Sequence, residues 1–502
     1  MSLKKNILAN YVSQIYVTLI GIIMVPLYVQ YMGSEAYGLV GFFAMLQAWF
    51  QLLDMGLTPT MVRTAAQFNG GAIDALSLRK LLRALEGIFI AVALLGGIAI
   101  LLGSEAIATG WLKVQLLPLE EVRNAIMIMA VIIALRWVCG LHRGVINGFE
   151  RLVWLSNFNI VMATARFVLV IPFFVYVGTS PTEFFSYQLL LAVIELIVLV
   201  VQAYRLLPNV DVSQRIQFQW EPLSSVLKFS ISIAFTSSVW VFVTQTDKLI
   251  LSNLLPLKDY AYFTLAVLVA SGVMVISGPI SSALLPRLTK LSAEGNDGEL
   301  IRLYRNATQM VSVIAIPLAL VLTFFAEQVL WAWTGDANIA RNVAPTLTLY
   351  ALGNGILALA AFPYYLQFAK SDLKLHLIGS ALFLVLLIPA LIWSTMQYGV
   401  IGAGYAWLGA NVIYFLVWVP KVHESFFKGL HAKWILQDVG VIGLFNFFSC
   451  LAIKALVDFP QSRMQVLFVI VIISVSLLLI SLLSSSFLRI QLHNKWEAFN
   501  WK

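Results

Sequence analysis

Long apolar blocks recur along the whole chain and are separated by short polar stretches. Each block holds about 20 residues, the length that a helix needs to cross the roughly 30 Å hydrocarbon core of a bilayer. Apolar positions repeat with a helical period rather than in alternation, so the blocks indicate membrane helices and not strands. The pattern predicts about fourteen spans: 7–30, 36–60, 84–103, 123–146, 153–177, 184–205, 226–252, 259–284, 307–331, 344–369, 375–396, 399–420, 436–457 and 465–486.

A polar segment separates the first six predicted spans from the next six, and the sequence repeats weakly across it. Six is an even number, so both halves should insert with the same orientation, as parallel repeats that rock about a central site. We therefore predict an all-α polytopic membrane protein built of two six-helix lobes around a central cavity. The predicted parts are an N-terminal lobe at 1–207, a cytoplasmic linker at 208–222, a second lobe at 223–420, two additional helices at 421–486 and an interfacial cytoplasmic tail at 487–502.

Composition supports this class of protein. Hydrophobic residues make up 60% of the chain and charged residues only 11%, with a mean hydropathy of +0.89, which excludes a soluble globular protein. The net charge of +8 reflects Lys and Arg retained in cytoplasmic loops, so we expect no nucleic-acid partner.

The distribution of basic residues predicts the orientation. Of the 32 Lys and Arg residues, Arg136 and Arg166 lie within spans, and seven lie on one face of the membrane, which leaves 23 on the other. The positive-inside rule then places both termini in the cytoplasm. The seven on the outer face are Lys113, Arg123, Lys248, Lys258, Arg341, Lys454 and Arg463.

Several enzyme classes are excluded by what the chain does not contain. No extramembrane segment exceeds about twenty residues, and the longest outer loop, about 104–121, is too small for the active site of a membrane polymerase or ligase. The five histidines show no metal-ligand spacing, and there is no nucleotide-binding loop. Cys139 and Cys450 lie in apolar runs and are predicted to be core residues. We expect a carrier rather than an enzyme, without a metal or cofactor.

Arg136 and Arg166 are the most informative residues, because each lies near the middle of a predicted span. A guanidinium at a helix centre costs roughly 2.5–3.5 kcal/mol, so such residues rarely face lipid. On the helical period Arg136, Arg143 and Asn147 share one face of the fourth span. The predicted polar lining of an interior cavity comprises Gln14, Gln47, Gln51, Asn147, Asn159, Gln188 and Glu195.

Two interpretations of the arginines remain open. In one, Arg136 or Arg166 pairs with Glu195 and locks two helices together. Two arginines against one carboxylate still leave a positive surplus, which a pyrophosphate would neutralise through bidentate hydrogen bonds. The second interpretation therefore predicts that Arg136, Arg143 and Arg166 bind an anionic cargo.

Other charged residues are candidates for a gate or for ion coupling. Asp54 and Arg63 lie toward the cytoplasmic end of the second predicted span, where they would shape a gate or anchor the helix at the interface. Asp247 and Lys248 lie near the outer end of the seventh span, and a local ion pair explains them as well as a transport role does.

The second half of the chain offers uncharged polar and aromatic candidates. Sugars fit such surfaces because their hydroxyls find hydrogen-bond partners while their C–H faces lie on aromatic rings. Aromatic belts at the membrane interfaces are the competing explanation. The sugar-facing candidates are Tyr350, Asn354, Tyr364, Tyr405, Asn411 and Tyr414.

Three stretches carry a resemblance to a known family. They are Asn10-Tyr11 with Gln14 and the turn from Gly33 to Gly38 running on to Asp54-Met55-Gly56; Arg143 to Gly148 with Arg151; and Asp247 to Leu251. With these motifs the chain resembles the Wzx-type polysaccharide flippases of the multidrug/oligosaccharidyl-lipid/polysaccharide exporter superfamily.

The resemblance implies an undecaprenyl-pyrophosphate-linked oligosaccharide, such as an O-antigen repeat unit, as cargo. It also implies the bacterial inner membrane as location, and a polysaccharide polymerase and a chain-length regulator as partner proteins. Energy would come from the membrane potential, or from protons or sodium ions coupled through Glu195 or Asp247.

The predicted number of spans and the shared fold leave two alternative functions open. Many members of this family have twelve spans. The predicted number of about fourteen spans in this chain resembles the branch of the superfamily that handles the peptidoglycan precursor. A drug extruder of the MATE type would share the fold, but its cationic cargo would require a surplus of carboxylates in the cavity, which is the opposite of what this chain offers.

Overall fold

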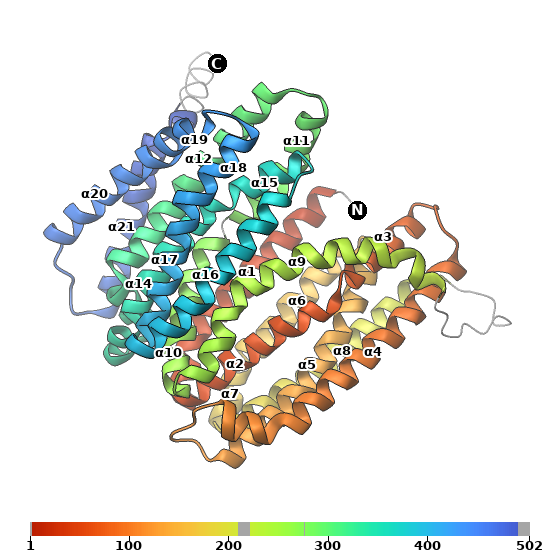
Figure 1. Ribbon diagram of the computed structural model, residues 1–502. Coiled ribbons are helices and arrows are strands. Elements are labelled where there is room, and N and C mark those ends of the chain that lie inside the picture. The colour runs from red at the N-terminus through yellow and green to blue at the C-terminus, as the bar shows by residue number, and fades with distance from the viewer. Residues whose placement is uncertain (1–2, 209–220, 276, 490–502) are drawn as a thin grey trace, which may run out of the picture. The chain divides into compact units, whose positions relative to one another are not determined.

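The computed structural model describes residues 3–208, 221–275 and 277–489, without the side chains of 3–5, 7, 221–237, 277–279 and 281–283. Helices make up almost all of these residues, and the described parts contain no β-strand (Figure 1). Thirteen helical segments among them are long and apolar enough to cross a membrane. The predicted all-α polytopic fold is therefore confirmed. The predicted span at 226–252 falls on α9 (Glu221–Leu254), much of which lacks described side chains.

The described chain divides into two compact units, Met1–Ala261 and Tyr262–Lys502. This division lies downstream of the predicted linker, because α9 packs on α2, α3 and α4 and so belongs with the first unit. Most of the predicted linker, at 209–220, and most of the predicted tail, at 490–502, lie outside the described residues.

In the first unit α5 is the central helix and contacts α3, α4 and α8, while α1 packs along α6 (Figure 1). The bounds are α1 Leu3–Met32, α2 Ser34–Phe50, η1 Gln51–Asp54, α3 Leu57–Asn69, α4 Ala75–Ala106, η2 Ile107–Trp111, α5 Leu119–Gly148, α6 Leu152–Phe167, α7 Val170–Tyr176, α8 Pro181–Leu206 and α9 as given above.

A buried apolar cluster holds α3, α4, α5 and α8 together. Met61, Leu85, Leu141 and Leu199 are all fully buried in it. At one end Gly148 lets α3 approach α5 closely, because a Cβ there would lie 2.5 Å from the Cβ of Ala65. The tight packing fixes the positions of the polar side chains that α5 and α8 carry on their other faces.

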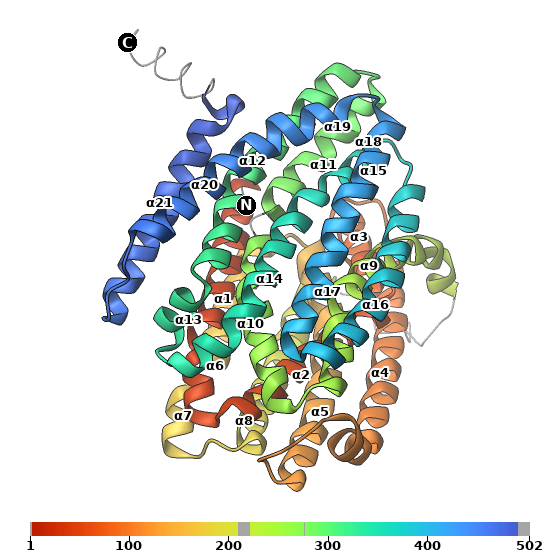
Figure 2. The ribbon, with the colours of Figure 1, turned by 60° about the vertical axis from the view of Figure 1, so that its left-hand side comes forward.

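In the second unit α12 contacts α14, α20 and α21, and α17 packs on α14 and α16 (Figure 2). The bounds are α11 Ser277–Ala293, α12 Asp297–Phe324, α13 Ala326–Thr334, α14 Ala337–Ala360, α15 Phe362–Ala369, α16 Lys374–Tyr398, α17 Val400–Ile413, η3 Tyr414–Trp418, α18 Val419–Phe426, α19 Leu430–Lys433, η4 Trp434–Gly440, α20 Val441–Leu456 and α21 Arg463–Ser484. Helix α10 (Leu257–Val275) begins in the first unit and ends in the second.

Two predicted spans are interrupted. The second, predicted at 36–60, is broken after Asp54, because Met55 and Gly56 adopt left-handed backbone angles with φ of 45° and 73°. The span itself is confirmed as Ser34–Asp54, and it ends six residues earlier than predicted. The fifth, predicted at 153–177, does cross as one segment but is broken between α6 and α7 at Val168 and Leu169.

Candidate functional site

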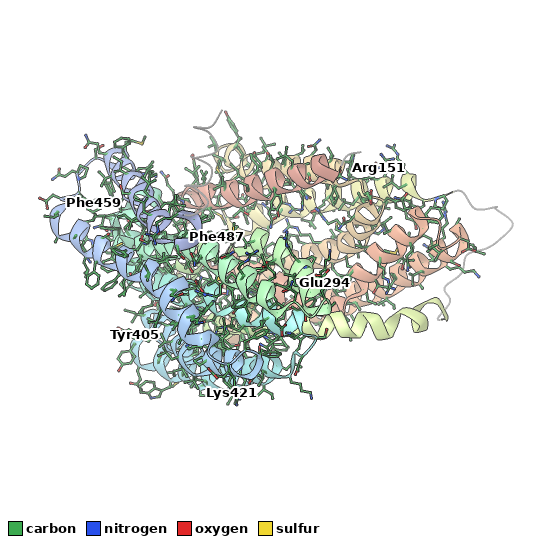
Figure 3. All side chains as sticks on the ribbon, turned by 90° about the horizontal axis from the view of Figure 1, so that it is seen from above. Arg151, Glu294, Tyr405, Lys421, Phe459 and Phe487 are labelled. Atoms are coloured by element: carbon green, nitrogen blue, oxygen red, sulfur yellow. The ribbon has the colours of Figure 1, made fainter. Side chains whose placement is uncertain are left out.

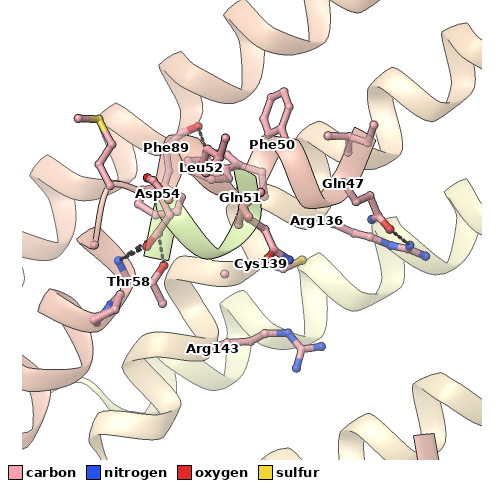
Figure 4. A pocket seen from close by; sticks show the side chains of 18 of the residues that line it. Gln47, Phe50, Gln51, Leu52, Asp54, Thr58, Phe89, Arg136, Cys139 and Arg143 are labelled. Carbon is pink, nitrogen blue, oxygen red and sulfur yellow. Dashed lines mark hydrogen bonds between the residues drawn. The ribbon is translucent and has the colours of Figure 1, made fainter. Parts of the chain in front are cut away.

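A cavity of about 600 Å³, here called the main cavity, lies inside the first unit (Figure 4). It is bounded by α2, η1, α3, α5 and α8, with contributions from α4, α6 and α9. Its polar lining residues are Gln47, Gln51, Asp54, Thr58, Arg136, Arg143, Arg166, Glu195 and Ser238. The structure thus brings together all three predicted cationic residues, although they come from two different helices.

The helix break after Asp54 forms part of the wall of this cavity. Asp54 caps the start of α3: its Oδ1 accepts hydrogen bonds from the Thr58 backbone N–H at 3.1 Å and from the Thr58 hydroxyl at 2.6 Å (Figure 4). A capping carboxylate satisfies N–H groups that the break leaves without helical partners. Broken backbone of this kind is tolerated at membrane depth where it lines a cavity.

Arg143 and Arg166 share one carboxylate. Arg143 Nη2 lies 2.5 Å from Glu195 Oε1, and Arg166 Nη2 donates to Glu195 Oε2. The second Nη of Arg143 donates to the side-chain oxygen of Asn159 at 2.5 Å. Glu195 is buried, with 2% of its surface exposed, so both cations hold it in the protein interior. The pairing with Glu195 that the helix-locking interpretation describes is therefore present for Arg166.

Arg136 is held differently. Its guanidinium donates to the side-chain oxygens of Gln47 at 3.4 Å and Gln188 at 3.2 Å, and it lies 5.4 Å from the centre of the Phe43 ring. Its Nε is buried without a hydrogen-bond partner. Among the described side chains no carboxylate lies within ion-pair distance of Arg136. Neutral amides orient this cation without neutralising it.

The described lining of the main cavity therefore carries a positive surplus. Three arginines face two carboxylates, Glu195 and Asp54. Asp54 is engaged in capping α3, whereas Glu195 is engaged by two of the arginines. An anion that enters would find Arg136 with unused donors, and Arg143 and Arg166 with a single shared counter-ion.

A second cavity of about 510 Å³ lies between α1 and α6 and is here called the α1–α6 cavity. Arg143 and Arg166 line it as well as the main cavity, so the Arg143–Glu195–Arg166 cluster borders both. Its other polar lining residues are Asn10, Ser13, Gln14, Thr18 and Asn159. The structure thus brings Gln14 of the first span and Asn159 of the fifth, both predicted to line an interior cavity, to the wall of the same cavity.

The break between α6 and α7 positions Arg166. Tyr28 donates to the carbonyls of Arg166 and Phe167 at 3.2 and 3.1 Å, and Gln188 donates to the Arg166 carbonyl at 3.2 Å. Tyr187 donates to the Ala165 carbonyl at 2.7 Å. These bonds satisfy carbonyls at the end of α6 and hold Arg166 near Glu195.

Other predicted residues of the first unit lie away from the two cavities. Asn147 is exposed near the end of α5, one turn beyond Arg143, because the polar face of the helix leaves the cavity there. Arg63 is an exposed residue of α3. Asp247 is 1% exposed and pairs with Lys248 at 3.2 Å, the local ion pair that the sequence allowed. Asn147 was predicted to line an interior cavity, but it is not part of the lining of either one. The roles of Arg63, Asp247 and Lys248 as gate or coupling residues stay predictions.

The sugar-facing candidates lie in the second unit, mostly within helix packing. Tyr350 and Asn411 are 1% exposed, and Asn354, 6% exposed, accepts a hydrogen bond from Trp407 at 3.0 Å. Burial of this degree leaves no surface for a sugar in this conformation. Tyr364 and Tyr414 are half-buried, with ring contacts to His376 and Phe383. Tyr405 is 48% exposed and lies at the edge of its unit (Figure 3).

Some residues of the site were not anticipated from the sequence. Tyr28 and Tyr187 hold the end of α6, and Ser238 of α9 lines the main cavity. Ser238 ends a run of small polar residues, Thr236-Ser237-Ser238, in an otherwise apolar block, which was a usable signal. The tyrosines gave none, because tyrosine occurs equally at interfaces and in cores.

Comparison with known proteins identifies the family and the fold. A family described as polysaccharide biosynthesis protein matches residues 3–292, more than half of the chain. A Shigella flexneri protein assigned as an O-antigen transporter is 20% identical over 407 residues, which cover 81% of this chain and 94% of that protein.

Two solved structures share the fold. The lipid II flippase MurJ in an inward closed conformation has a TM-score of 0.72 and 16% identity, and the match covers 95% of this chain and 97% of MurJ. An inward-facing multidrug resistance transporter of the MATE family has a TM-score of 0.65 and 15% identity, with 81% and 94% covered. The resemblance inferred from the sequence motifs is confirmed, and the similar proteins are transporters and flippases.

Proposed function

We propose that this protein is a flippase for an undecaprenyl-pyrophosphate-linked oligosaccharide. The chain belongs to the family described as polysaccharide biosynthesis protein. The cargo would be an O-antigen or related polysaccharide repeat unit, moved from the cytoplasmic to the periplasmic leaflet of the bacterial inner membrane. The family match and the thirteen candidate spans directly support a multi-pass membrane carrier that is related to polysaccharide biosynthesis proteins. The cargo and the direction are the proposal.

The observation that carries the proposal is the cationic surplus of the main cavity. A pyrophosphate diester bears two negative charges and presents several acceptor oxygens. Arg136, oriented by Gln47 and Gln188 and without a described carboxylate partner, is the first partner for it. As the headgroup advances, its second phosphate competes with Glu195 for Arg143 and Arg166.

Alternating access would carry the headgroup across while the prenyl tail stays in lipid. With both termini in the cytoplasm, an outside-positive potential favours outward movement of negative charge by about 2.3 kcal/mol per charge per 100 mV. The same potential favours inward return of the empty cationic cavity. No chemical step on the cargo is required, so the proposal is transport without catalysis.

Two other cargoes define the alternatives. The lipid II flippase MurJ matches 95% of this chain, so lipid II is the second candidate. Lipid II also carries a pyrophosphate, and the cavity charge does not separate it from an O-antigen precursor. A cationic drug is disfavoured, because it would meet a positive surplus where it needs carboxylates.

The test is a flipping assay in proteoliposomes with Arg136→Ala. Loss of hydrogen bonds to a charged group costs about 1.5–3 kcal/mol, so flipping of the undecaprenyl-pyrophosphate oligosaccharide should fall roughly 10- to 100-fold. Arg123→Ala is the matched control, because Arg123 lies on the same helix but is about half exposed and pairs with exposed Glu105.

Unchanged flipping in a well-folded Arg136→Ala variant would remove this residue from the mechanism. Parallel assays with lipid II and with a cationic dye assign the cargo. Transport of the dye alone would replace the flippase by a drug extruder.

A further inference from the structure

A buried polar cluster outside both cavities joins α4, α5 and α8. Glu86 of α4 and His142 of α5 are 7% and 3% exposed, and the His142 Nε2 lies 3.4 Å from a Glu86 carboxylate oxygen. Tyr204 of α8 donates to both Glu86 oxygens at 2.7 and 3.0 Å, and Arg83 pairs with Glu86 at 3.2 Å. None of these four residues is among the lining residues of the two cavities.

The hydrogen bonding of His142 fixes where its protons lie. Its Nδ1 lies 3.1 Å from the backbone carbonyl of Val138, one turn earlier in α5. A carbonyl can only accept, so Nδ1 carries a hydrogen. The other nitrogen, Nε2, is buried, faces Glu86 and makes no hydrogen bond. A neutral imidazole would therefore aim a lone pair at a carboxylate.

One added proton resolves this conflict. It can lie on Nε2, giving an imidazolium opposite a carboxylate, or on Glu86, giving a carboxylic acid that donates to Nε2. Without it, the lone pair and the negative charge repel each other beside buried apolar side chains, since Leu85 and Leu141 directly precede Glu86 and His142 in their helices. The pair is thus built to hold one dissociable proton. No group of three or more His, Cys, Asp or Glu side chains suited to a metal ion occurs among the described residues.

The cluster is within reach of solvent. Arg83 has 59% of its side chain exposed and Tyr204 is 40% exposed, so the carboxylate is one side chain from the surface. These two are the titratable groups that contact Glu86 and His142 in the described structure. A proton can arrive along this edge.

The same two helices form a wall of the main cavity. Phe89 follows Glu86 by one turn of α4, and its carbonyl accepts a hydrogen bond from Trp137 of α5 at 3.1 Å. The two rings stack with centroids 4.8 Å apart, and both residues line the main cavity. Arg143, which pairs with Glu195, is the neighbour of His142 in α5. A change in the α4–α5 contact at Glu86 therefore reaches the cavity wall within one helical turn.

We propose that Glu86 and His142 form a proton-binding site that couples proton uptake to the packing of the main cavity wall. The bound proton joins α4 to α5, and its release loosens this contact and the wall beside it. The binding of the proton stands on the geometry of the pair alone. Its coupling to cargo movement rests on the proposed flippase function.

The first experiment measures the proton directly and needs no cargo. Full-length protein with ¹⁵N-labelled histidine has five histidine signals to resolve, and His142→Gln identifies the one that belongs to His142. We expect Nδ1 to carry a hydrogen throughout and the Nε2 signal to report the shared proton by changing with pH, with a different response in Glu86→Gln. A signal that shows one unchanging protonation state throughout would overturn the proposal.

The second experiment tests coupling through the pH profile of flipping in proteoliposomes. The double variant Glu86→Gln/His142→Gln keeps hydrogen-bonding side chains at the α4–α5 contact but holds no dissociable proton. Wild-type flipping should vary with pH, by at most about tenfold per pH unit for one proton, and the double variant should be flat. His376→Gln, a histidine of the second unit packed against Tyr364, is the control and should keep the wild-type profile.

A pH profile that persists in the double variant would overturn the coupling. If neither the wild-type protein nor any variant flips the tested cargo, the proposed flippase function is wrong. The histidine NMR experiment still shows whether Glu86 and His142 bind a proton. The two failures are therefore distinguishable.

Discussion

Buried charges are treated differently in the two units of this protein. In the second unit Asp438, fully buried, is matched by Arg305 through bonds of 2.7 and 3.0 Å and by Gln309 at 2.7 Å. In the first unit Arg143 and Arg166 share one carboxylate, whereas the partners of Arg136 among the described side chains are two amides and an aromatic ring. The second unit uses charge to fasten helices, whereas the first keeps a positive surplus beside a cavity.

The difference teaches how to separate a structural ion pair from a binding site in an apolar protein. A matched pair such as Asp438 and Arg305 gives an incoming ion nothing to neutralise. A cluster with more cations than anions, bordering two cavities, is stabilised by any anion that enters. Substitutions that change the buried charges of one unit without those of the other test this difference.

Glu195→Gln should have the largest effect. It leaves Arg143 and Arg166 without a negative partner, and breaking a buried pair in this way costs about 3–5 kcal/mol. The lower end applies, because the two arginine side chains remain 29% and 21% exposed. The measurement is the apparent Tm in detergent, with and without inorganic pyrophosphate, which should raise the Tm of this variant more than that of the wild type.

Glu299→Gln is the control for this variant. Glu299 forms an exposed pair with Arg302 that is worth less than about 1 kcal/mol. If Glu195→Gln unfolds at the wild-type temperature, the arginines do not depend on Glu195 and the surplus has been misjudged.

Asp438→Asn should follow in size. It leaves one cation, Arg305, rather than two without a negative partner, so the cost should not exceed about 3 kcal/mol, the lower end of the range for a broken buried pair. Pyrophosphate should not restore its Tm, since the partners form a closed network rather than a cavity lining. Rescue as large as that of Glu195→Gln would erase the contrast between the units.

Asp54→Ala and Asp336→Ala form a matched pair of helix caps. Asp54 caps α3 through Thr58, and Asp336 caps α14 through the backbone of Asn338 and Ile339. Each substitution should cost about 1 kcal/mol of stability. Only Asp54→Ala should also slow flipping, because its cap lies in the cavity wall. Equal flipping rates in the two variants would show that the break after Asp54 serves folding alone.

The predictable part of this protein follows from hydropathy. Long apolar blocks must become helices in lipid, so the spans and the interior position of Arg136 and Arg166 could be inferred from sequence alone. The break between α6 and α7 could not, because its carbonyls are satisfied by Tyr28 and Gln188 from distant spans. The partner of each arginine also depends on distances between helices, which no single-chain pattern records.

The same limit explains the second unit. A polar face on a membrane helix indicates that something polar lies opposite, and it does not distinguish a neighbouring helix from a water-filled cavity. Asn354 lies opposite Trp407, whereas Gln47 lies opposite Arg136 at the edge of a cavity. From the sequence the two amides were equivalent.

Tyr405→Phe should have the smallest effect and is the sharpest test of the remaining sugar-facing candidates. Tyr405 is exposed on α17, and its ring meets only the edge of Tyr398 among the ring contacts of the described residues, at 5.8 Å. Loss of its hydroxyl should change stability by less than about 0.5 kcal/mol, as for most surface substitutions. Flipping should also be unchanged if the ring belongs to an interfacial belt. Phe at this position keeps the ring and removes the hydrogen bond that a sugar would use. Slower flipping at an unchanged Tm would therefore place the oligosaccharide against the second unit, and would show that neutral aromatic surface takes part in transport beside the cationic cavity.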